Sequence, residues 1–329
     1  MTALLRVRHL STSFQTEAGL VRAVDDVSFD LAEGETLGLV GESGSGKTVT
    51  ALSILRLIPQ PPGAFGPESR IEYDGVDLLR LPSRELRKVR GAQIAMIFQE
   101  PMSSLNPVLT VGSQISEAIR AHEPVSRKEA NDRAVELLDL VGIPEPGRRF
   151  RDYPHQMSGG MQQRVMIGMA LSCRPKILIA DEPTTALDVT IQAQILDLLL
   201  ELKERFAMSV LFITHDLGVL AGVADRVAVM YGGSIVEQGP VRAVFEQPAH
   251  PYTRGLLHAV PRVDRPSDRI EGIPGSVPTA TAWPSGCRFH PRCSECMKRC
   301  EVDAPPSYSA GTDHTARCWL LDQSEGQRQ

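Results

Sequence analysis

Residues Gly41 to Thr48 have the types and the spacing of a phosphate-binding loop. They read Gly-Glu-Ser-Gly-Ser-Gly-Lys-Thr and satisfy the pattern G-x-x-x-x-G-K-[ST] at every fixed position. Glycines let backbone N–H groups approach phosphate oxygens, and a following helix adds a favourable dipole. Lys47 is expected to reach the β- and γ-phosphates, and the Thr48 hydroxyl to hold Mg²⁺. This segment predicts that the chain binds a nucleoside triphosphate.

The flanking segments supply the context that such a loop requires. Thr36–Val40 is a short apolar run typical of a buried strand, and Val49–Leu57 has the apolar spacing of a helix. A glycine turn with an incidental lysine is the competing interpretation, and the strand–loop–helix order argues against it. The residues expected to contact the nucleotide here are Gly41, Glu42, Ser43, Gly44, Ser45, Gly46, Lys47, Thr48 and Val49.

Two adjacent carboxylates follow a second apolar run, Lys176–Ala180. A strand that ends in Asp181 and Glu182 places both at the carboxyl edge of a parallel sheet, where α/β folds bind ligands. Asp181 suits Mg²⁺, directly or through water, because hard cations prefer carboxylate oxygens. Glu182 could polarise the attacking water, a role usually worth about 10²–10⁴ in rate.

Two further polar residues each end a predicted strand. His215 follows the strand at 209–213 and could contact the γ-phosphate, although a lone histidine is often structural. Gln99 follows the strand at 93–98, and it could bind the metal or the water, or simply cap the strand.

Two candidate sites have equally plausible structural explanations. Ser158, Gly159 and Gly160 precede a helix predicted from Gln162 to about Leu171, which makes either an anion site or an ordinary helix cap. Phe14 is predicted to lie in the loop after the first strand, where its ring could stack on adenine or pack locally.

Composition and element order define the fold class. The chain has 329 residues, a net charge of −5, 42% hydrophobic and 23% charged residues, which is ordinary for a globular protein and gives no sign of a nucleic-acid partner. No apolar run approaches the length of a membrane span and no signal-peptide pattern is present, so we expect a cytosolic chain. Short antiparallel strands within 4–32, alternating strands and helices later, and a helical segment at about 100–170 predict an α/β fold.

Together these motifs resemble the ATP-binding subunit of an ABC transporter over about residues 4–245. In that comparison Gly41–Thr48 is the Walker A motif, Gln99 the Q-loop and Ser158–Gly160 the signature. The remaining matches are Ile177–Asp181 as Walker B, Glu182 as catalytic glutamate, Ala186–Asp188 as D-loop, His215 as H-loop and Phe14 as the A-loop aromatic.

The resemblance implies a fold and a mode of assembly. The fold is a P-loop NTPase, with a RecA-like core, an antiparallel β-subdomain and an inserted helical subdomain. It also implies that Ser158–Gly160 act on ATP held by a partner chain, and that Asp188 of the D-loop is one of the nucleotide-site residues. A second ATPase subunit, as a heterodimer first and a homodimer second, and two membrane permease subunits would complete the transporter at the cytoplasmic side of the membrane.

Further segments are similar to the oligopeptide/dipeptide importer branch, which implies import of peptides or of a related solute such as nickel. These segments are Glu100–Pro107, Tyr153–His155, Asp181–Val189, His250–Thr253, Ile273–Pro278 and Gly286–Cys293. The signature departs from L-S-G-G-Q by carrying Met157 and Met161 at its ends. A soluble ABC ATPase acting on ribosomes or DNA is the alternative, but the chain has neither a second cassette nor a basic arm.

Prolines accumulate after about residue 245, which predicts a boundary between a nucleotide-binding domain (1–245) and an extension (246–329). Five of the six cysteines lie after residue 286 in this extension. In a cytosolic chain such clustering favours metal or cluster binding over disulfides. A [4Fe–4S] cluster, zinc or no metal all remain open. The resemblance implies a cluster held by Cys287, Cys293, Cys300 and Cys318, with Cys296 as an extra.

Overall fold

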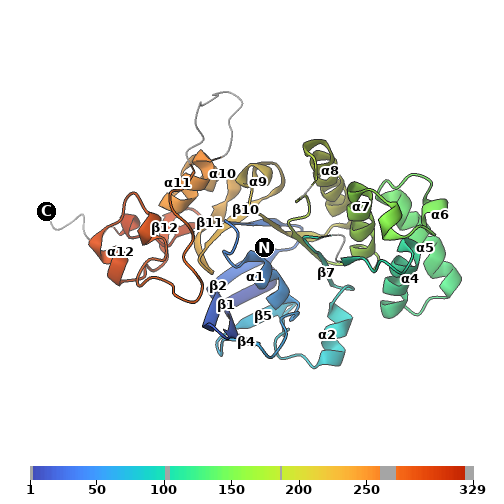
Figure 1. Ribbon diagram of the computed structural model, residues 1–329, viewed down its shortest axis with the longest axis horizontal. Coiled ribbons are helices and arrows are strands. Elements are labelled where there is room, and N and C mark those ends of the chain that lie inside the picture. Colours follow the sequence, from blue (N-terminus) through green and yellow to red (C-terminus); the bar gives the residue numbers. More distant parts are fainter. Residues whose placement is uncertain (1–2, 101–103, 186, 260–271, 323–329) are drawn as a thin grey trace. The chain divides into compact units, whose positions relative to one another are not determined.

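The computed structural model describes residues 3–100, 104–185, 187–259 and 272–322 (Figure 1). The chain divides into two compact units, which are described separately. The first comprises residues 1–32, 36–79 and 213–329, and the second comprises 33–35 and 80–212.

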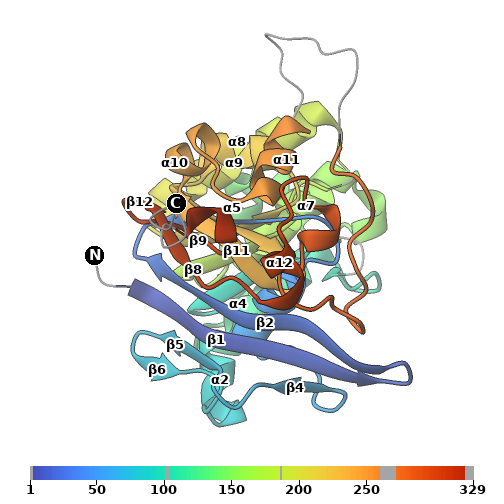
Figure 2. The same ribbon diagram turned by 90° about the vertical axis from the view of Figure 1, so that its left-hand side faces the viewer.

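The first unit contains an antiparallel sheet built on a long hairpin (Figure 2). Its strands are β1 (Ala3–Thr16), β2 (Gly19–Ala32), β4 (Gly63–Phe65), β5 (Arg70–Tyr73) and β6 (Val76–Asp77). The order is β2-β1-β5-β6, and β4 also pairs with β1. The short strands expected within 4–32 are therefore parts of two long strands. The placement of Phe14 in a loop was wrong: it lies in β1, opposite Val21 and Gly63.

A second group of strands in this unit surrounds the phosphate-binding segment. It comprises β3 (Thr36–Val40), β10 (Arg226–Tyr231), β11 (Ser234–Pro240), β12 (Tyr308–Gly311) and β13 (His314–Ala316). β10 runs parallel to β3 and forms an antiparallel hairpin with β11, whereas β13 pairs with both β11 and β12. All five residues of β3 are buried, as the uninterrupted apolar pattern of a parallel strand predicts. The extension thus adds strands to this sheet.

The helices of the first unit are α1 (Lys47–Ile54), α9 (Leu217–Val223), α10 (Val241–Glu246), α11 (Pro251–His258) and α12 (Lys298–Val302), with the 3₁₀ turns η2 (His290–Arg292) and η3 (Trp319–Leu321). α1 follows the phosphate-binding loop directly, as predicted. The extension is therefore more regular than its prolines indicate, because its short helices are joined to strands that complete a sheet.

The second unit has a parallel strand pair and most of the helices. β7 (Ile94–Ile97) pairs in register with β8 (Ile177–Asp181), and β9 (Ser209–Thr214) leads from this unit into the first. The helices are α2 (Ser83–Val89), α4 (Val111–His122), α5 (Arg127–Leu140), α6 (Pro146–Arg149), α7 (Gly159–Ala170) and α8 (Val189–Phe206), with the 3₁₀ turn η1 (Pro154–Gln156). The expected helical segment is confirmed, with Ala130, Ala134 and Leu138 buried along α5. α7 begins three residues before the predicted start because Ser158 caps it.

Candidate nucleotide site

The phosphate-binding loop lies between β3 and α1 in the first unit, and its glycines are required by close packing. A Cβ on Gly41 would lie 2.1 Å from the carbonyl oxygen of Met230. Gly46 has a φ of +101° and would bring a Cβ within 2.5 Å of the Ala23 oxygen. No side chain caps α1 at Gly46. The loop therefore presents backbone at the helix start, which is the arrangement that binds phosphate.

Lys47 and Ser45 are the buried polar residues of the loop segment 41–48. The Lys47 ammonium is 5% exposed and donates hydrogen bonds to the carbonyl oxygens of Gly41 at 2.7 Å and Glu42 at 3.1 Å. Ser45 Oγ is buried and, among the described residues, has no hydrogen-bond partner. A buried hydroxyl of this kind is costly unless a ligand completes its bonding. The loop fits a triphosphate on these grounds.

The two predicted carboxylates end β8 in the second unit. Asp181 is 1% exposed and is the last residue of the strand. Glu182 follows with a φ of +46°, an uncommon conformation for a non-glycine residue that is often found at functional sites. Oxygen donors such as these suit Mg²⁺.

Gln99 and Thr185 both hold the Glu182 side chain. Gln99 Nε2 donates to Glu182 Oε2 at 3.2 Å, and Thr185 Oγ1 donates to the same oxygen at 2.8 Å. Gln99 and Glu182 were predicted independently, and the structure brings them together. Thr185 was missed, because a threonine in a turn gives no chemical signal of its own.

The signature residues and Asp188 begin two helices of the second unit. Ser158 caps α7, with its Oγ accepting from the N–H of Met161 at 3.4 Å. Asp188 caps α8, with Oδ1 accepting from Ile191 N–H at 2.9 Å. Ser158, Gly159 and Asp188 are exposed, and Ala186 lies outside the described residues. Both caps therefore face solvent in this chain.

His215 and Phe14 belong to the first unit, with the phosphate-binding loop. His215 is exposed immediately after β9, and the next residue, Asp216, caps α9 by accepting from Gly218 N–H at 2.7 Å. Phe14 is half-buried in β1. Within their own units, Gln99, Glu182, Ser158, Asp188 and His215 each lie just after a strand or at the start of a helix. Phe14 is the exception, because it lies inside β1.

The cysteines of the extension gather in one place. Cys287, Cys293, Cys300 and Cys318 line a single small cavity, whereas Cys296 is exposed. Burial raises the pKa of both Cys287 and Cys318 to about 11, and the neighbouring cysteines raise it as well. Over the described ranges, no three or more histidine, cysteine or acidic side chains are close enough to hold one metal ion.

Known proteins match both parts of the chain. The ABC transporter family matches residues 24–185, and the C-terminal region of oligopeptide/dipeptide transporters matches 236–300. The dipeptide transport ATP-binding protein DppD of Bacillus subtilis is 52% identical over 98% of this chain and 96% of its own length. AppD, an oligopeptide transport ATP-binding protein of the same organism, is 49% identical over 100% of both chains.

The chain belongs to the ATP-binding subunits of ABC transporters.

Solved structures agree with this assignment. The dimeric ATP-binding cassette MJ0796 bound to ADP and Pi has a TM-score of 0.64 and 29% identity, covering 72% of this chain and 99% of that one. This ABC subunit is thus an ATP-hydrolysing enzyme with a P-loop NTPase fold. Its C-terminal part carries the oligopeptide/dipeptide transporter region. No helix in the described part of the chain is long and apolar enough to cross a membrane.

Proposed function

We propose that this chain powers a peptide importer from the cytoplasmic side of the membrane. The observation that carries the proposal is the Glu182 carboxylate held by Gln99 and Thr185, one residue after the buried Asp181. An intact carboxylate in this arrangement supports hydrolysis, and it argues against a regulator that only binds ATP. The relatives named as dipeptide and oligopeptide transport ATP-binding proteins support the choice of solute.

In the proposed mechanism, bound ATP with Mg²⁺ supplies the reactive γ-phosphoryl group. The backbone of Gly41–Val49 binds the phosphates, and Lys47 neutralises their charge. The resemblance to ABC ATPases implies that Thr48, Asp181 and Gln99 would provide oxygen ligands for the magnesium ion. Glu182 takes the proton of the attacking water, while His215 contacts the γ-phosphate and Phe14 the adenine ring.

The exposed signature supports assembly with a second ATPase subunit. Ser158 and Gly159 begin α7 at the surface, and Asp188 does so at α8. We propose that they contact ATP held by a partner chain, in a heterodimer. Closure of the two subunits would then drive two permease subunits between their states. In this assembly, residues 1–245 form the nucleotide-binding domain and 246–329 the extension.

We propose a [4Fe–4S] cluster as the first choice of metal centre in the extension, with zinc as the alternative. The proposal rests on the resemblance to cluster-bearing members of the branch and on the four cysteines that line one cavity. Cys287, Cys293, Cys300 and Cys318 would be its ligands.

Peptide uptake by the reconstituted transporter tests the proposed function. Proteoliposomes containing the complete transporter should accumulate labelled di- and oligopeptides only with ATP, and Lys47→Ala should abolish accumulation because the phosphates lose their main cation. Lys203→Ala, on α8, is the control and should behave as wild type. ATP hydrolysis without uptake of any peptide would remove the solute assignment and leave the ATPase assignment intact.

A further inference from the structure

Arg292 of the extension forms a two-pronged ion pair with Glu42 of the phosphate-binding loop. Its Nη1 lies 2.7 Å from Glu42 Oε2, and its Nη2 lies 3.0 Å from Oε1. The Arg292 side chain is 4% exposed, and that of Glu42 is 30% exposed. Bidentate pairs of this kind are strong and directional, and shielding from solvent increases their strength.

The rest of the Arg292 guanidinium is fixed by the extension and by β10. Nε donates to the Pro274 oxygen at 2.9 Å, and Nη2 donates to the Ile273 oxygen at 3.3 Å. The guanidinium also lies 5.8 Å from the centre of the Tyr231 ring. These contacts hold Arg292 whether or not Glu42 is charged. Lysine could not reproduce them, because it lacks a planar fork of donors.

Glu42 connects Arg292 to Lys47, the lysine of the phosphate-binding loop. Its backbone N–H donates to Tyr252 Oη at 2.9 Å, and Tyr252 is fully buried. Its carbonyl oxygen accepts from the Lys47 ammonium at 3.1 Å. The extension therefore holds Glu42 by both side chain and backbone, next to the lysine of the loop.

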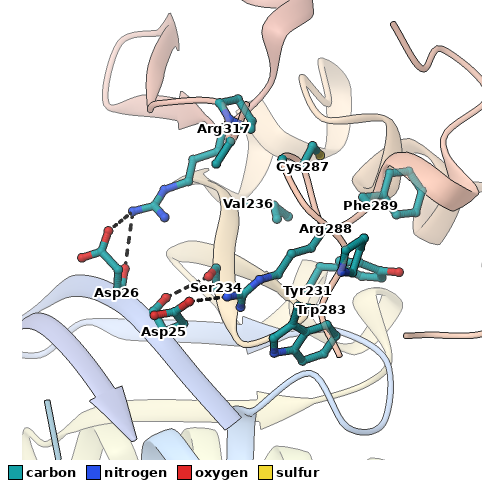
Figure 3. Close-up of a pocket in the computed structure, with 14 residues that line it drawn as sticks. Asp25, Asp26, Tyr231, Ser234, Val236, Trp283, Cys287, Arg288, Phe289 and Arg317 are labelled. Carbon is teal, nitrogen blue, oxygen red and sulfur yellow. Dashed lines mark hydrogen bonds and ion pairs between the residues drawn. The ribbon is translucent and has the colours of Figure 1, made fainter. Parts of the chain in front are cut away.

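A second arginine of the extension, Arg288, contacts a turn that is itself hydrogen-bonded to the loop (Figure 3). Arg288 donates to the Gly232 oxygen and forms an ion pair with Asp25 of β2. The next residue in that turn, Gly233, donates from its N–H to the Ser45 oxygen at 3.0 Å. Arg288 and Arg292 lie in the same cysteine-bearing segment, which thus contacts the loop directly through Arg292 and contacts the turn bonded to Ser45 through Arg288.

We propose that Arg292 is a positioning residue for nucleotide binding, through which the extension controls the affinity of the loop for ATP. Glu42 places a negative charge in the loop that must accept a polyanion. Arg292 neutralises that charge and fixes the loop through the same pair of hydrogen bonds. Without Arg292, the carboxylate would repel the phosphates, and more strongly for ATP than for ADP because ATP carries more charge.

The test is equilibrium titration of the full-length chain with fluorescent ATP and ADP analogues, at low and high salt. Arg292→Gln should weaken ATP binding roughly tenfold, within the usual range for coupling between sites, and ADP binding by less. Glu42→Gln removes the charge but leaves only one acceptor for Arg292, so it serves as the background for a double-variant cycle. In that background, Arg292→Gln should weaken ATP binding much less than it does in the wild type.

Arg299→Gln is the matched control, because Arg299 lies in the same extension and pairs with Asp322 at 3.0 Å. It should bind both nucleotides as wild type does. Two results would overturn the proposal: ATP affinity of Arg292→Gln equal to that of Arg299→Gln, or an equal loss of ATP affinity from Arg292→Gln in the Glu42→Gln and wild-type backgrounds. If Arg292→Gln does not fold, Arg292→Lys takes its place, and wild-type ATP affinity in that variant would contradict the proposal because lysine lacks the planar fork of donors. The inference rests on the loop as nucleotide site, and wild-type ATP binding in the same titration tests that separately.

Discussion

Gln99 Nε2 and Thr185 Oγ1 both donate hydrogen bonds to Oε2 of Glu182, and this shared acceptor fixes the orientation of the carboxylate. Glu182 itself follows β8 in a left-handed backbone conformation. One carboxylate oxygen is thus held by two side chains of the second unit. A general base works best when its geometry is set before the substrate arrives.

Removing the Thr185 hydroxyl tests this orientation. Thr185→Val keeps the side-chain shape and deletes the donor, so kcat for ATP hydrolysis should fall about tenfold with little change in KM. Thr190→Val, in the first turn of α8, is the control and should leave kcat unchanged. Equal kcat values for wild type and Thr185→Val would show that the hydroxyl does not orient Glu182.

A pair of glycine substitutions separates close packing from backbone strain. Gly46 and Gly19 have similar φ values, +101° and +113°, but only a Cβ on Gly46 would meet backbone, at 2.5 Å. Gly19→Ala should cost about 1 kcal/mol of stability and leave ATP binding intact. Gly46→Ala should abolish detectable ATP binding. Chemical unfolding measures the loss of stability, and nucleotide titration measures ATP affinity. Equal ATP affinities for Gly19→Ala and Gly46→Ala would show that the loop does not need a glycine at position 46.

The Glu123–Arg133 ion pair predicts a pH dependence of stability. The hydrogen bond from Arg133 holds the pKa of Glu123 below 4.5, so the pair stabilises the fold at neutral pH, and this is lost as pH falls through the lowered pKa. Because both side chains are partly exposed, Glu123→Gln should cost less than about 1 kcal/mol at pH 7. The difference from wild type in urea unfolding should shrink below pH 4.5. A difference that grows on acidification would have the wrong sign.

Two cysteine substitutions test the proposed metal centre. Cys293→Ser removes one of the four cysteines that line the cavity, and Cys296→Ser removes the exposed one. Anaerobically purified wild type and Cys296→Ser should contain iron and sulfide and absorb visible light, whereas Cys293→Ser should lose most of both. Stoichiometric zinc in place of iron would assign a zinc site, and metal-free wild type would reject both.

The sequence predicted the phosphate-binding loop with its flanking strand and helix, because these depend on local patterns. Phe14 was misplaced, since a residue in a long twisted strand has the same local composition as one in a loop. Thr185 and Arg292 were missed for another reason. A threonine such as Thr185 has no reactive group that would single it out in the sequence. Arg292 acts through a residue distant in sequence, and only the fold shows that it contacts Glu42.

The assignment of Glu182 as the base is tested most directly by Glu182→Gln in the assembled transporter. We expect this variant to bind ATP with an affinity close to that of the wild type. Its kcat for hydrolysis should fall by at least about 10², because the amide cannot accept a proton from water. Glu201→Gln, an exposed residue on α8, should hydrolyse ATP normally. Hydrolysis by Glu182→Gln within a few-fold of the wild-type rate would show that Glu182 is not the general base.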